Sequence, residues 1–384
     1  MGLRAVGVAA CFLLACSTAK VREGFTNLPA DGGSGGGDRP DTGPPLPPTG
    51  DGGEAVCTPS KLNYDIPGNN CDDDGDGQVD NAVVCDSGLA LDGNAEGFAS
   101  ALGICRSASD GGWGLISATF LDGYNTTGKP NDGQHGIMPK FGSVLTPREG
   151  GSLGVLSSGW AREYNNKNGT YDKYACFRSG ATMGSYMGGS VPSGYPKSIA
   201  GCDADTDVYD VIVIRMKLRA PGNAKGLSFN FNFMSGEWPE YVCTNYNDGF
   251  LAMLTSKAFN NGVAENISFD PQQRPVSVNN GFFDRCQGGT TTCGRSTCAG
   301  GDGELWGTGF YCPGVHCYSG TTKEDTGGGA TGWLETQAPI EPGEEITLDF
   351  MIWDTGDASF DSSVLLDNFQ WIAGETKTYT DRPR

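Results

Sequence analysis

An Asp-rich run near residue 75 is the clearest candidate for chemistry in this sequence. In residues 71–81, CDDDGDGQVDN, every second residue from Asp72 to Asp76 carries a carboxylate, and a Gly follows. Alternate residues of a tightly coiled loop point inward, Gly permits the sharp turn, and oxygen ligands at about 2.4 Å suit Ca²⁺. The spacing therefore predicts a calcium site. Its ligands would be the carboxylates of Asp72, Asp74, Asp76 and Asp80 and the backbone carbonyl of Gln78.

The run is not an EF-hand. The position of the bidentate Glu in an EF-hand is Val83 here, and no helical pattern flanks the loop. Bounded by Cys57 and Cys85, the segment resembles the Asp- and Cys-rich metal-binding motifs of myxobacterial surface proteins. The alternative interpretation is a solvated acidic linker that binds no ion.

A second set of oxygen-bearing side chains lies in the C-terminal half. Pro239 stands between two Glu residues and beside two aromatic residues, and its fixed φ can aim both carboxylates at one loop. Clusters that contain only oxygen ligands suit Ca²⁺ rather than zinc or copper. The second candidate acidic site comprises Glu237, Glu240, Asn247, Asp248, Asp357 and Asp361. These residues could instead cap turns and bridge strands. A further acidic run comprises Asp203, Asp205, Asp207 and Asp210. It could bind an ion weakly or cap its own loop.

The same carboxylates keep an enzymatic alternative open. A glycosidase needs two acidic groups that face each other across a sugar, and sequence spacing cannot show that separation. Only two histidines exist, His135 and His316, and the sequence contains no G-x-S-x-G motif. We therefore expect a protein without catalytic activity, with a secreted carboxylate-dependent hydrolase as the alternative.

The first fifteen residues predict export. Arg4 precedes an apolar stretch from Ala5 to Leu14, and the sequence Leu-Leu-Ala-Cys ends at Cys16. This end resembles the lipobox of bacterial lipoproteins, whose Cys is acylated and becomes the first mature residue. An ordinary secretory signal is the alternative. Ser17 is not the Asp that retains lipoproteins at the inner membrane, so we expect an exported, lipid-anchored protein at the outer membrane or cell surface.

Cysteine number and charge agree with export. Without Cys11 in the signal and Cys16, twelve cysteines remain, an even number that predicts disulfides in an oxidising compartment. The spacing near His316 does not match a zinc site. A net charge of −20 disfavours nucleic acid as a partner. The disulfide candidates, whose pairing stays open, are Cys57, Cys71, Cys85, Cys105, Cys176, Cys202, Cys243, Cys286, Cys293, Cys298, Cys312 and Cys317.

Composition divides the rest of the chain. Residues 16–56 are rich in Gly and Pro and predict a disordered tether, residues 57–85 form the Asp- and Cys-rich segment, and residues 372–384 form a polar tail. Within 86–371, residues 214–218, 227–233 and 346–352 alternate apolar with polar side chains, as half-buried strands do. With Gly- and Asn-rich loops between them, these runs predict an antiparallel, jelly-roll-like β-sandwich rich in disulfides.

Several motifs in the C-terminal half resemble one known family. Residues 233–243 read FMSGEWPEYVC and residues 246–250 read YNDGF; NISFD follows at 266–270 and PVSVNN at 275–280. WDTGD at 353–357 and FDSSV at 360–364 close the pattern. Together these motifs resemble the choice-of-anchor L domain family across about 208–371. The resemblance implies an extracellular β-rich domain carried on proteins with varied surface attachments, and it implies no particular chemistry.

The combined expectation is a cell-surface lipoprotein that acts without catalysis. Bound calcium would rigidify its acidic loops, and its partner would be an extracellular glycan or an envelope protein. A purely architectural envelope protein is the remaining alternative.

Overall fold

A computed structural model describes residues 57–162, 189–202, 205–239, 241–286, 298–310 and 328–383. The predicted signal peptide, Cys16 and the linker to residue 56 lie outside these residues. So do Glu240, Asp203, His316, Cys176, Cys293, Cys312 and Cys317. The described helices are short: α1 (Ala95–Ala101), α2 (Ala108–Gly111), and the 3-10 turns η1 (Asp132–Gln134), η3 (Asn260–Gly262) and η5 (Gly303–Leu305).

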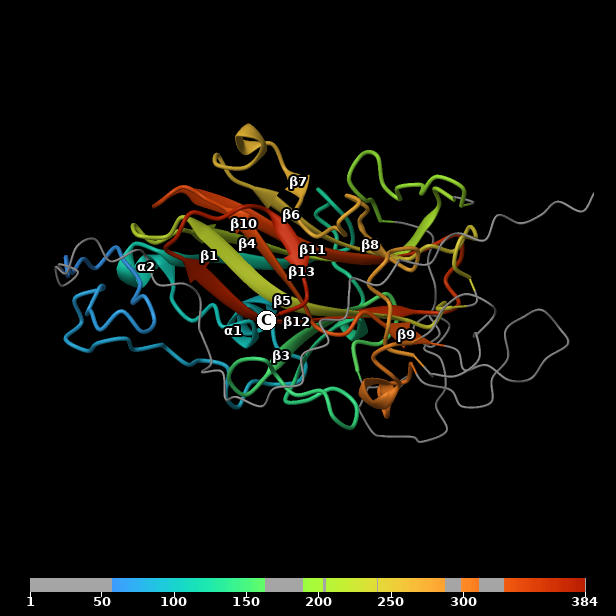
Figure 1. Ribbon diagram of the computed structural model, residues 1–384, viewed down its shortest axis with the longest axis horizontal. Helices are drawn as coiled ribbons and strands as arrows, with labels where there is room; N and C mark the ends of the chain where they lie inside the picture. The colour runs from blue at the N-terminus through green and yellow to red at the C-terminus, as the bar shows by residue number, and fades with distance from the viewer. Residues whose placement is uncertain are drawn as a thin grey trace, which may run out of the picture. The chain divides into compact units, whose positions relative to one another are not determined.

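Two antiparallel sheets make up the body of the protein (Figure 1). The first sheet, in spatial order, contains β1 (Gly114–Leu121), β4 (Val208–Arg219), β11 (Glu345–Thr355), β6 (Gly249–Thr255) and β7 (Glu265–Asn266), and β8 (Val276–Ser277) also pairs with β6.

The second sheet contains β13 (Tyr379–Asp381), β10 (Leu334–Pro339), β5 (Gly226–Ser235), β12 (Ser362–Ile372), β3 (Leu153–Ser157) and β2 (His135–Met138), and β9 (Gly329–Ala330) also pairs with β5. The predicted antiparallel β-sandwich is confirmed.

The chain interlocks the two sheets. It crosses from one sheet to the other at each step from β4 to β5 to β6, and again from β10 to β11 to β12. In the first sheet β11 lies between β4 and β6, while in the second sheet β5 lies between β10 and β12. Each central strand is therefore paired on both sides with strands from the other half of the domain.

Phenylalanines fill the space between the sheets. Phe229 and Phe231 of β5 contact Phe350 of β11 and Phe250 of β6, with ring centroids 4.7 Å and 4.9 Å apart. All four side chains are fully buried. The alternation that predicts a strand at 227–233 thus places its apolar set against the opposite sheet, as period-two patterning requires.

The predicted polar face of β5 is also buried, contrary to the expectation that each strand wets one face. A second apolar cluster that includes Phe141, Leu305 and Phe310 packs with Met234 of β5 and Leu365 of β12. These covering segments carry no periodic pattern that points to β5, so the alternation alone could not reveal them. One of the buried polar residues of β5 has an internal partner, since the side-chain amide of Asn368 donates to Asn230 Oδ1 at 2.8 Å.

The Asp-rich segment attaches to the turn between β4 and β5. The Gly222 amide donates to the Leu62 carbonyl at 2.6 Å, and Tyr64 and Asn223 exchange two hydrogen bonds of 3.0 Å and 2.8 Å. At the other terminus, the predicted polar tail contributes β13, which pairs with β10. Both ends of residues 57–383 are therefore tied to the sandwich.

Disulfide use is confirmed for eight of the predicted cysteines. The bonded pairs are Cys57–Cys71, Cys85–Cys105, Cys202–Cys243 and Cys286–Cys298. The last pair takes Cys298 out of any zinc site, in agreement with the sequence interpretation. Closing such loops stabilises a native state mainly by restricting the unfolded chain.

His135, at the start of β2, is held as a neutral group. Its ring stacks on Phe120 with centroids 3.8 Å apart, and it lines a cavity of about 290 Å³ with Asp92, Asp132 and Arg162. Burial and the nearby Arg162 guanidinium lower the pKa of His135 to about 4, against the smaller opposing effects of Asp132 and Asp92. The native state therefore disfavours the imidazolium.

We predict that the unfolding free energy falls in acid and that replacing His135 with a residue that does not titrate removes this loss. Because the folded pKa lies below the unfolded value of 6.5, the stabilising contribution is present above pH 6.5 and is lost as pH falls towards 4. Between pH 7 and pH 5 the wild type should lose about 1–2 kcal/mol of unfolding free energy relative to His135→Phe, which keeps the stacked ring. Urea unfolding at each pH measures this difference, and parallel curves for the two proteins would contradict it.

Candidate metal centre

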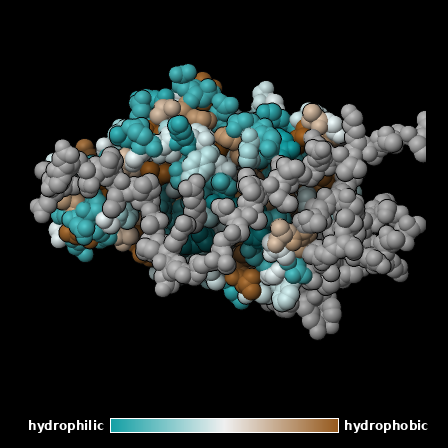
Figure 2. Space-filling model, in the orientation of Figure 1, coloured by the Kyte–Doolittle hydropathy of each residue, from teal (hydrophilic) through white to brown (hydrophobic). Residues whose placement is uncertain are grey.

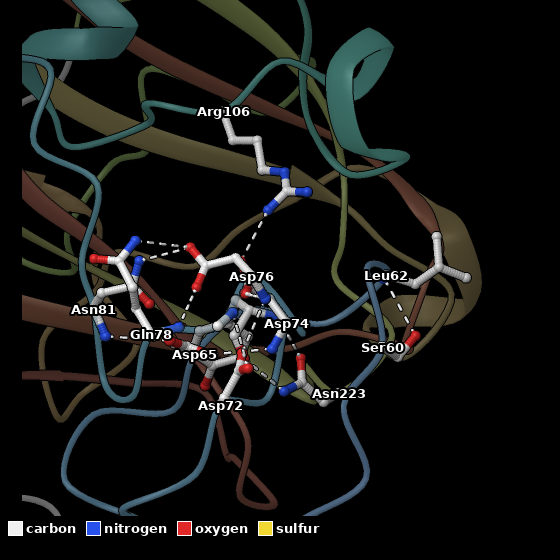
Figure 3. Close-up of polar contacts among 12 residues, drawn as sticks. Ser60, Leu62, Asp65, Asp72, Asp74, Asp76, Gln78, Asn81, Arg106 and Asn223 are labelled. Atoms are coloured by element: carbon white, nitrogen blue, oxygen red, sulfur yellow. Dashed lines mark hydrogen bonds and ion pairs between the residues drawn. The ribbon is translucent and has the colours of Figure 1, made fainter.

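Three carboxylates of the Asp-rich segment converge on one point (Figure 3). Asp65, Asp72 and Asp74 each offer an oxygen, and these three atoms lie within 4.8 Å of one another. Two oxygens that each lie about 2.4 Å from one Ca²⁺ can be separated by at most about twice that bond length, which is about 4.8 Å. The arrangement is therefore compatible with a single calcium ion, and all three side chains are partly buried.

Backbone amides hold these carboxylates in place. The Asp74 and Asn81 amides donate to the two oxygens of Asp65, at 3.0 Å and 3.1 Å. The two oxygens of Asp72 accept from the amides of Asp76 and Gly77, both at 3.0 Å. Gly77 has a φ of 91°, which a residue with a Cβ adopts only under strain. The loop is thus organised by the carboxylates that a metal would use.

The other two predicted carboxylates, those of Asp76 and Asp80, make contacts elsewhere in the loop. The Asp76 carboxylate accepts from the Gln78 amide at 2.7 Å and from the side-chain amide of Asn81 at 3.0 Å. The Asp80 carboxylate accepts from the amides of Asn69 and Asn70, both at 3.1 Å. Neither Asp76 nor Asp80 belongs to the group of three converging carboxylates in the described structure.

Asp65 is the residue that sequence reasoning missed. It lies seven residues before Asp72, on the other side of the turn that ends at Cys71, and so falls outside the alternating run. The Cys57–Cys71 disulfide closes the loop that contains it. An acidic residue between Cys57 and Cys71 was the sequence feature that could have indicated a further carboxylate at this site.

Electrostatics in the loop favour a cation. Burial raises the pKa of Asp74, and the neighbouring carboxylates of Asp76 and Asp65 raise it further. The Asp76 amide and the Arg106 guanidinium oppose that rise, the latter from 3.3 Å. Arg106 is also stacked over the ring of Trp113, 4.6 Å from its centroid, so its position is fixed. One cationic side chain thus faces a group of at least three carboxylates.

The second candidate set is assembled at the opposite end of β4 and β5. Glu237 follows β5, Asp248 precedes β6, and Asp361 precedes β12. These three side chains are 2%, 0% and 0% exposed. Asp354, near the end of β11, joins them with 2% exposure, and Asp210 of β4 is 3% exposed. The sequence interpretation included the first three residues but not Asp354.

Burial raises the pKa values of Glu237, Asp248 and Asp354, and neighbouring carboxylates add to the rise at Glu237 and Asp354. Desolvation raises the pKa of Glu237, and Asp248 and Asp357 add to that rise. Desolvation also dominates at Asp248, whose pKa is raised to about 7 although Ser362 and the Thr355 amide donate to it at 2.6 Å and 3.0 Å. These side chains form one interacting group.

Asn247 and Asp357 make the structural contacts that the alternative interpretation described. Asn247 Oδ1 accepts from the Asn279 amide at 3.1 Å, and Asp357 Oδ1 accepts from the Ser359 amide at 2.9 Å. Asp205 likewise caps its own loop by accepting from the amides of Thr206 and Asp207. Asp357 and Asp205 thus cap turns, whereas Asn247 bridges two segments of the chain.

The buried acids do not form an open glycosidase site. Glu237 and Asp361 are almost completely buried, so a sugar cannot reach them in this structure. Two carboxylates that flank a glycosidic bond must both contact the substrate. The geometry therefore does not favour the hydrolase alternative at these residues.

Comparison with known proteins identifies the C-terminal half. The family model described as Choice-of-anchor L domain matches residues 197–370. No significant match was found among curated proteins or among solved structures. Within the described residues, no helix has the length and apolar character that crossing a membrane requires.

The match covers most strands of both sheets. It includes the interlocked strands from β4 to β12 and the acids at their ends, while β1, β2 and β3 come from residues before it. The resemblance seen in the motifs at 233–250 and 353–364 is thereby confirmed. Residues 197–370 therefore match the choice-of-anchor L domain family, and this match indicates a surface-associated β-sandwich module.

Proposed function

We propose that the protein is a lipid-anchored module of the bacterial cell surface that recognises a glycan of the envelope without catalysis. Calcium bound to its Asp-rich segment keeps the module rigid. The observation that carries the calcium part is the convergence of Asp65, Asp72 and Asp74 within 4.8 Å in a disulfide-closed loop.

Calcium fits this loop better than other common metals. Three carboxylates supply hard oxygen ligands, and loop carbonyls and water complete the six to eight positions that Ca²⁺ takes. The loop cysteines Cys57 and Cys71 are bonded to each other and offer no thiolate. Zinc and copper sites normally use such sulfur or imidazole ligands.

Removing single carboxylates tests the ligand set. In saturating calcium the mature protein should gain about 2.7 kcal/mol of unfolding free energy when free calcium exceeds Kd a hundredfold. Asp65→Asn and Asp72→Asn should remove most of this gain, whereas Asp76→Asn should retain it, because Asp76 points away from the converging oxygens. Thermal unfolding in calcium and in chelator provides the measurement.

The exposed Glu345→Gln variant is the control for loss of one negative charge. An equal calcium response in wild type and Asp72→Asn would sink the proposed site. Loss of the response in Asp76→Asn but not in Asp65→Asn would instead support the ligands predicted from the alternating run.

A cavity on the outer face of the first sheet supports glycan recognition. It has a volume of about 200 Å³ and combines an aromatic ring with hydrogen-bonding and charged side chains. Arg215 forms two bonds with Asp349, at 2.6 Å and 2.8 Å, and its guanidinium lies 5.6 Å from the ring of Tyr124. The cavity is lined by Tyr124, Asn125, Arg215, Lys217, Thr255, Thr347 and Asp349.

The charge of this cavity indicates an acidic sugar. Lys217 is exposed and forms no ion pair with any described residue, although the chain carries a net charge of −20. A free ammonium group on an acidic protein attracts carboxylate-bearing ligands in preference to neutral ones. In Figure 2 the visible described surface is mostly hydrophilic, with separate hydrophobic spots, as expected for a surface-exposed module.

Binding to oligosaccharides tests this recognition. Uronic-acid oligosaccharides should bind more tightly than neutral ones, and Lys217→Ala should weaken that binding about ten- to a hundredfold, since a charged contact contributes roughly 1.5–3 kcal/mol. Lys257→Ala, which removes an exposed lysine outside the cavity, should bind as the wild type does. Calorimetry measures both, and equal binding of neutral and acidic sugars would refute the assignment.

Lipid anchoring at Cys16 has a direct test. Cys16→Ala should release the protein from sedimented membranes and abolish labelling by a radioactive fatty acid, because several acyl chains on one residue provide the anchor. Cys11→Ala removes a thiol from the predicted signal peptide and should leave the protein in the membrane fraction. Retention of the Cys16 variant in membranes would show that another part of the chain attaches it.

A further inference from the structure

The candidate calcium site faces a cation that belongs to another part of the chain. Residues 57–85 carry six Asp and a single Lys. Among the ion pairs between described residues, only that of Arg106 with Asp74 includes an acid of this segment. Arg106 Nη1 lies 3.3 Å from Asp74 Oδ2, and Asp74 is one of the three converging carboxylates. Figure 3 shows the Arg106 side chain extending towards the acidic loop from a separate segment.

Covalent and backbone contacts fix Arg106 beside the loop. It follows Cys105, which is bonded to Cys85 at the end of the Asp-rich segment. The Arg106 carbonyl accepts from the Leu115 amide of β1 at 2.7 Å. The next residue, Ser107, caps α2 through its side chain. The backbone that carries this guanidinium is therefore held in place, and the positive charge is a permanent part of the surroundings of the site.

The guanidinium has a second partner besides Asp74. Its central carbon lies 4.6 Å from the centroid of the Trp113 ring. A contact of this kind at a partly exposed site is about as strong as a partly exposed ion pair. The side chains of Arg106 and Asp74 are 24% and 14% exposed, so the pair is within reach of solvent. Arg106 can therefore leave Asp74 at little cost and remain on the ring.

Calcium and Arg106 compete for the same carboxylate. Asp74 Oδ1 accepts from the Asp76 amide at 3.0 Å, and Asp74 Oδ2 accepts from Arg106. A calcium ion at the point of convergence needs an oxygen of Asp74 and brings two positive charges close to the guanidinium. Like charges a few ångströms apart repel, and they repel more strongly in a partly buried site than in bulk water. Each cation therefore weakens the hold of the other on Asp74.

We propose that Arg106 is a built-in competitor of calcium, which pairs with Asp74 when calcium is absent, lowers the calcium affinity of the loop, and is released onto Trp113 when calcium binds. This inference rests on the calcium site proposed above and adds the regulation of that site. Extracellular calcium modules have Kd values of about 10⁻⁴–10⁻³ M. An affinity in this range makes occupancy follow the external calcium concentration instead of being permanent.

A purely structural ion pair makes the opposite prediction. If Arg106 only ties the loop to the segment before β1, its removal loosens the carboxylates that calcium needs. Calcium binding then becomes weaker. If Arg106 is a competitor, its removal makes calcium binding tighter. The sign of the change in affinity therefore separates the two roles.

Calorimetric titration of the full mature chain with calcium measures that sign. Arg106→Gln should bind calcium about tenfold more tightly, since a unit charge a few ångströms from a divalent ion in a solvated site has an effect of this order. Arg106→Lys keeps the charge and should bind within about threefold of the wild type. Lys61→Gln is the matched control: it removes the exposed cation of the segment, which forms no ion pair with a described residue, and should bind as the wild type does.

Fluorescence of the unaltered protein provides a second measurement that does not depend on the folding of Arg106→Gln. Calcium should change the tryptophan emission with the same midpoint as binding, because the guanidinium shifts its position over the Trp113 ring. Trp113→Phe keeps an aromatic ring and should bind calcium without this change. An emission that stays constant while calcium binds overturns the release of Arg106.

The outcomes distinguish failure of this inference from failure of the calcium site. Calcium binding that is equal or weaker in Arg106→Gln than in the wild type overturns the competitor and leaves the loop site standing. Equal tightening in Arg106→Gln and Lys61→Gln also overturns it, because any lost positive charge then has the same effect. Binding in Arg106→Gln but not in the wild type supports the competitor and refutes calcium in the native loop. No binding in any of these proteins refutes both.

Discussion

The interlock of the two sheets is the constraint on which the rest of this structure depends. Each central strand pairs with neighbours from the other half of the domain, as Phe350 of β11 does opposite Ile214 of β4. Neither sheet can be completed until the last strands have been added, so the contacts that define the fold are distant in sequence. Topologies of this kind fold slowly compared with those built from local contacts. The placing of the buried acids Glu237, Asp248, Asp354 and Asp361 depends on the same feature, since the interlock brings residues 354–361 beside residues 237–248.

Sequence patterns were sufficient where a local physical rule decides the outcome. Alternation at 214–218, 227–233 and 346–352 marked strands because a pleated strand shows its two faces in turn. An even set of cysteines in an exported chain indicated disulfides, and eight of those residues are bonded. The motifs at 233–250 and 353–364 identified the family that residues 197–370 match.

Features that depend on the path of the chain in space could not be read from these patterns. Asp65 reaches the loop site because the chain reverses before Cys71, and Asp354 reaches Asp248 because β11 pairs with β6. The polar face of β5 was expected to contact solvent, but loops near Phe141 and Phe310 cover it. In each case the deciding contact joins segments whose own sequences carry no sign of their partner. Spacing within one segment therefore predicted the type of side chain at the candidate site better than the particular residues that converge there.

The attachment of the Asp-rich segment to the β4–β5 turn has a mechanical consequence. Cys57 belongs to this segment, and Glu237 follows the other end of β5, a strand of ten residues. These two ends are about 30 Å apart at roughly 3.3 Å per residue. With the proposed anchor at Cys16, a pull from a partner held at the far end would run nearly parallel to the strands. Such a force loads the hydrogen bonds between strands together in shear instead of opening them one after another, which is the direction in which a β-sandwich best resists being pulled apart.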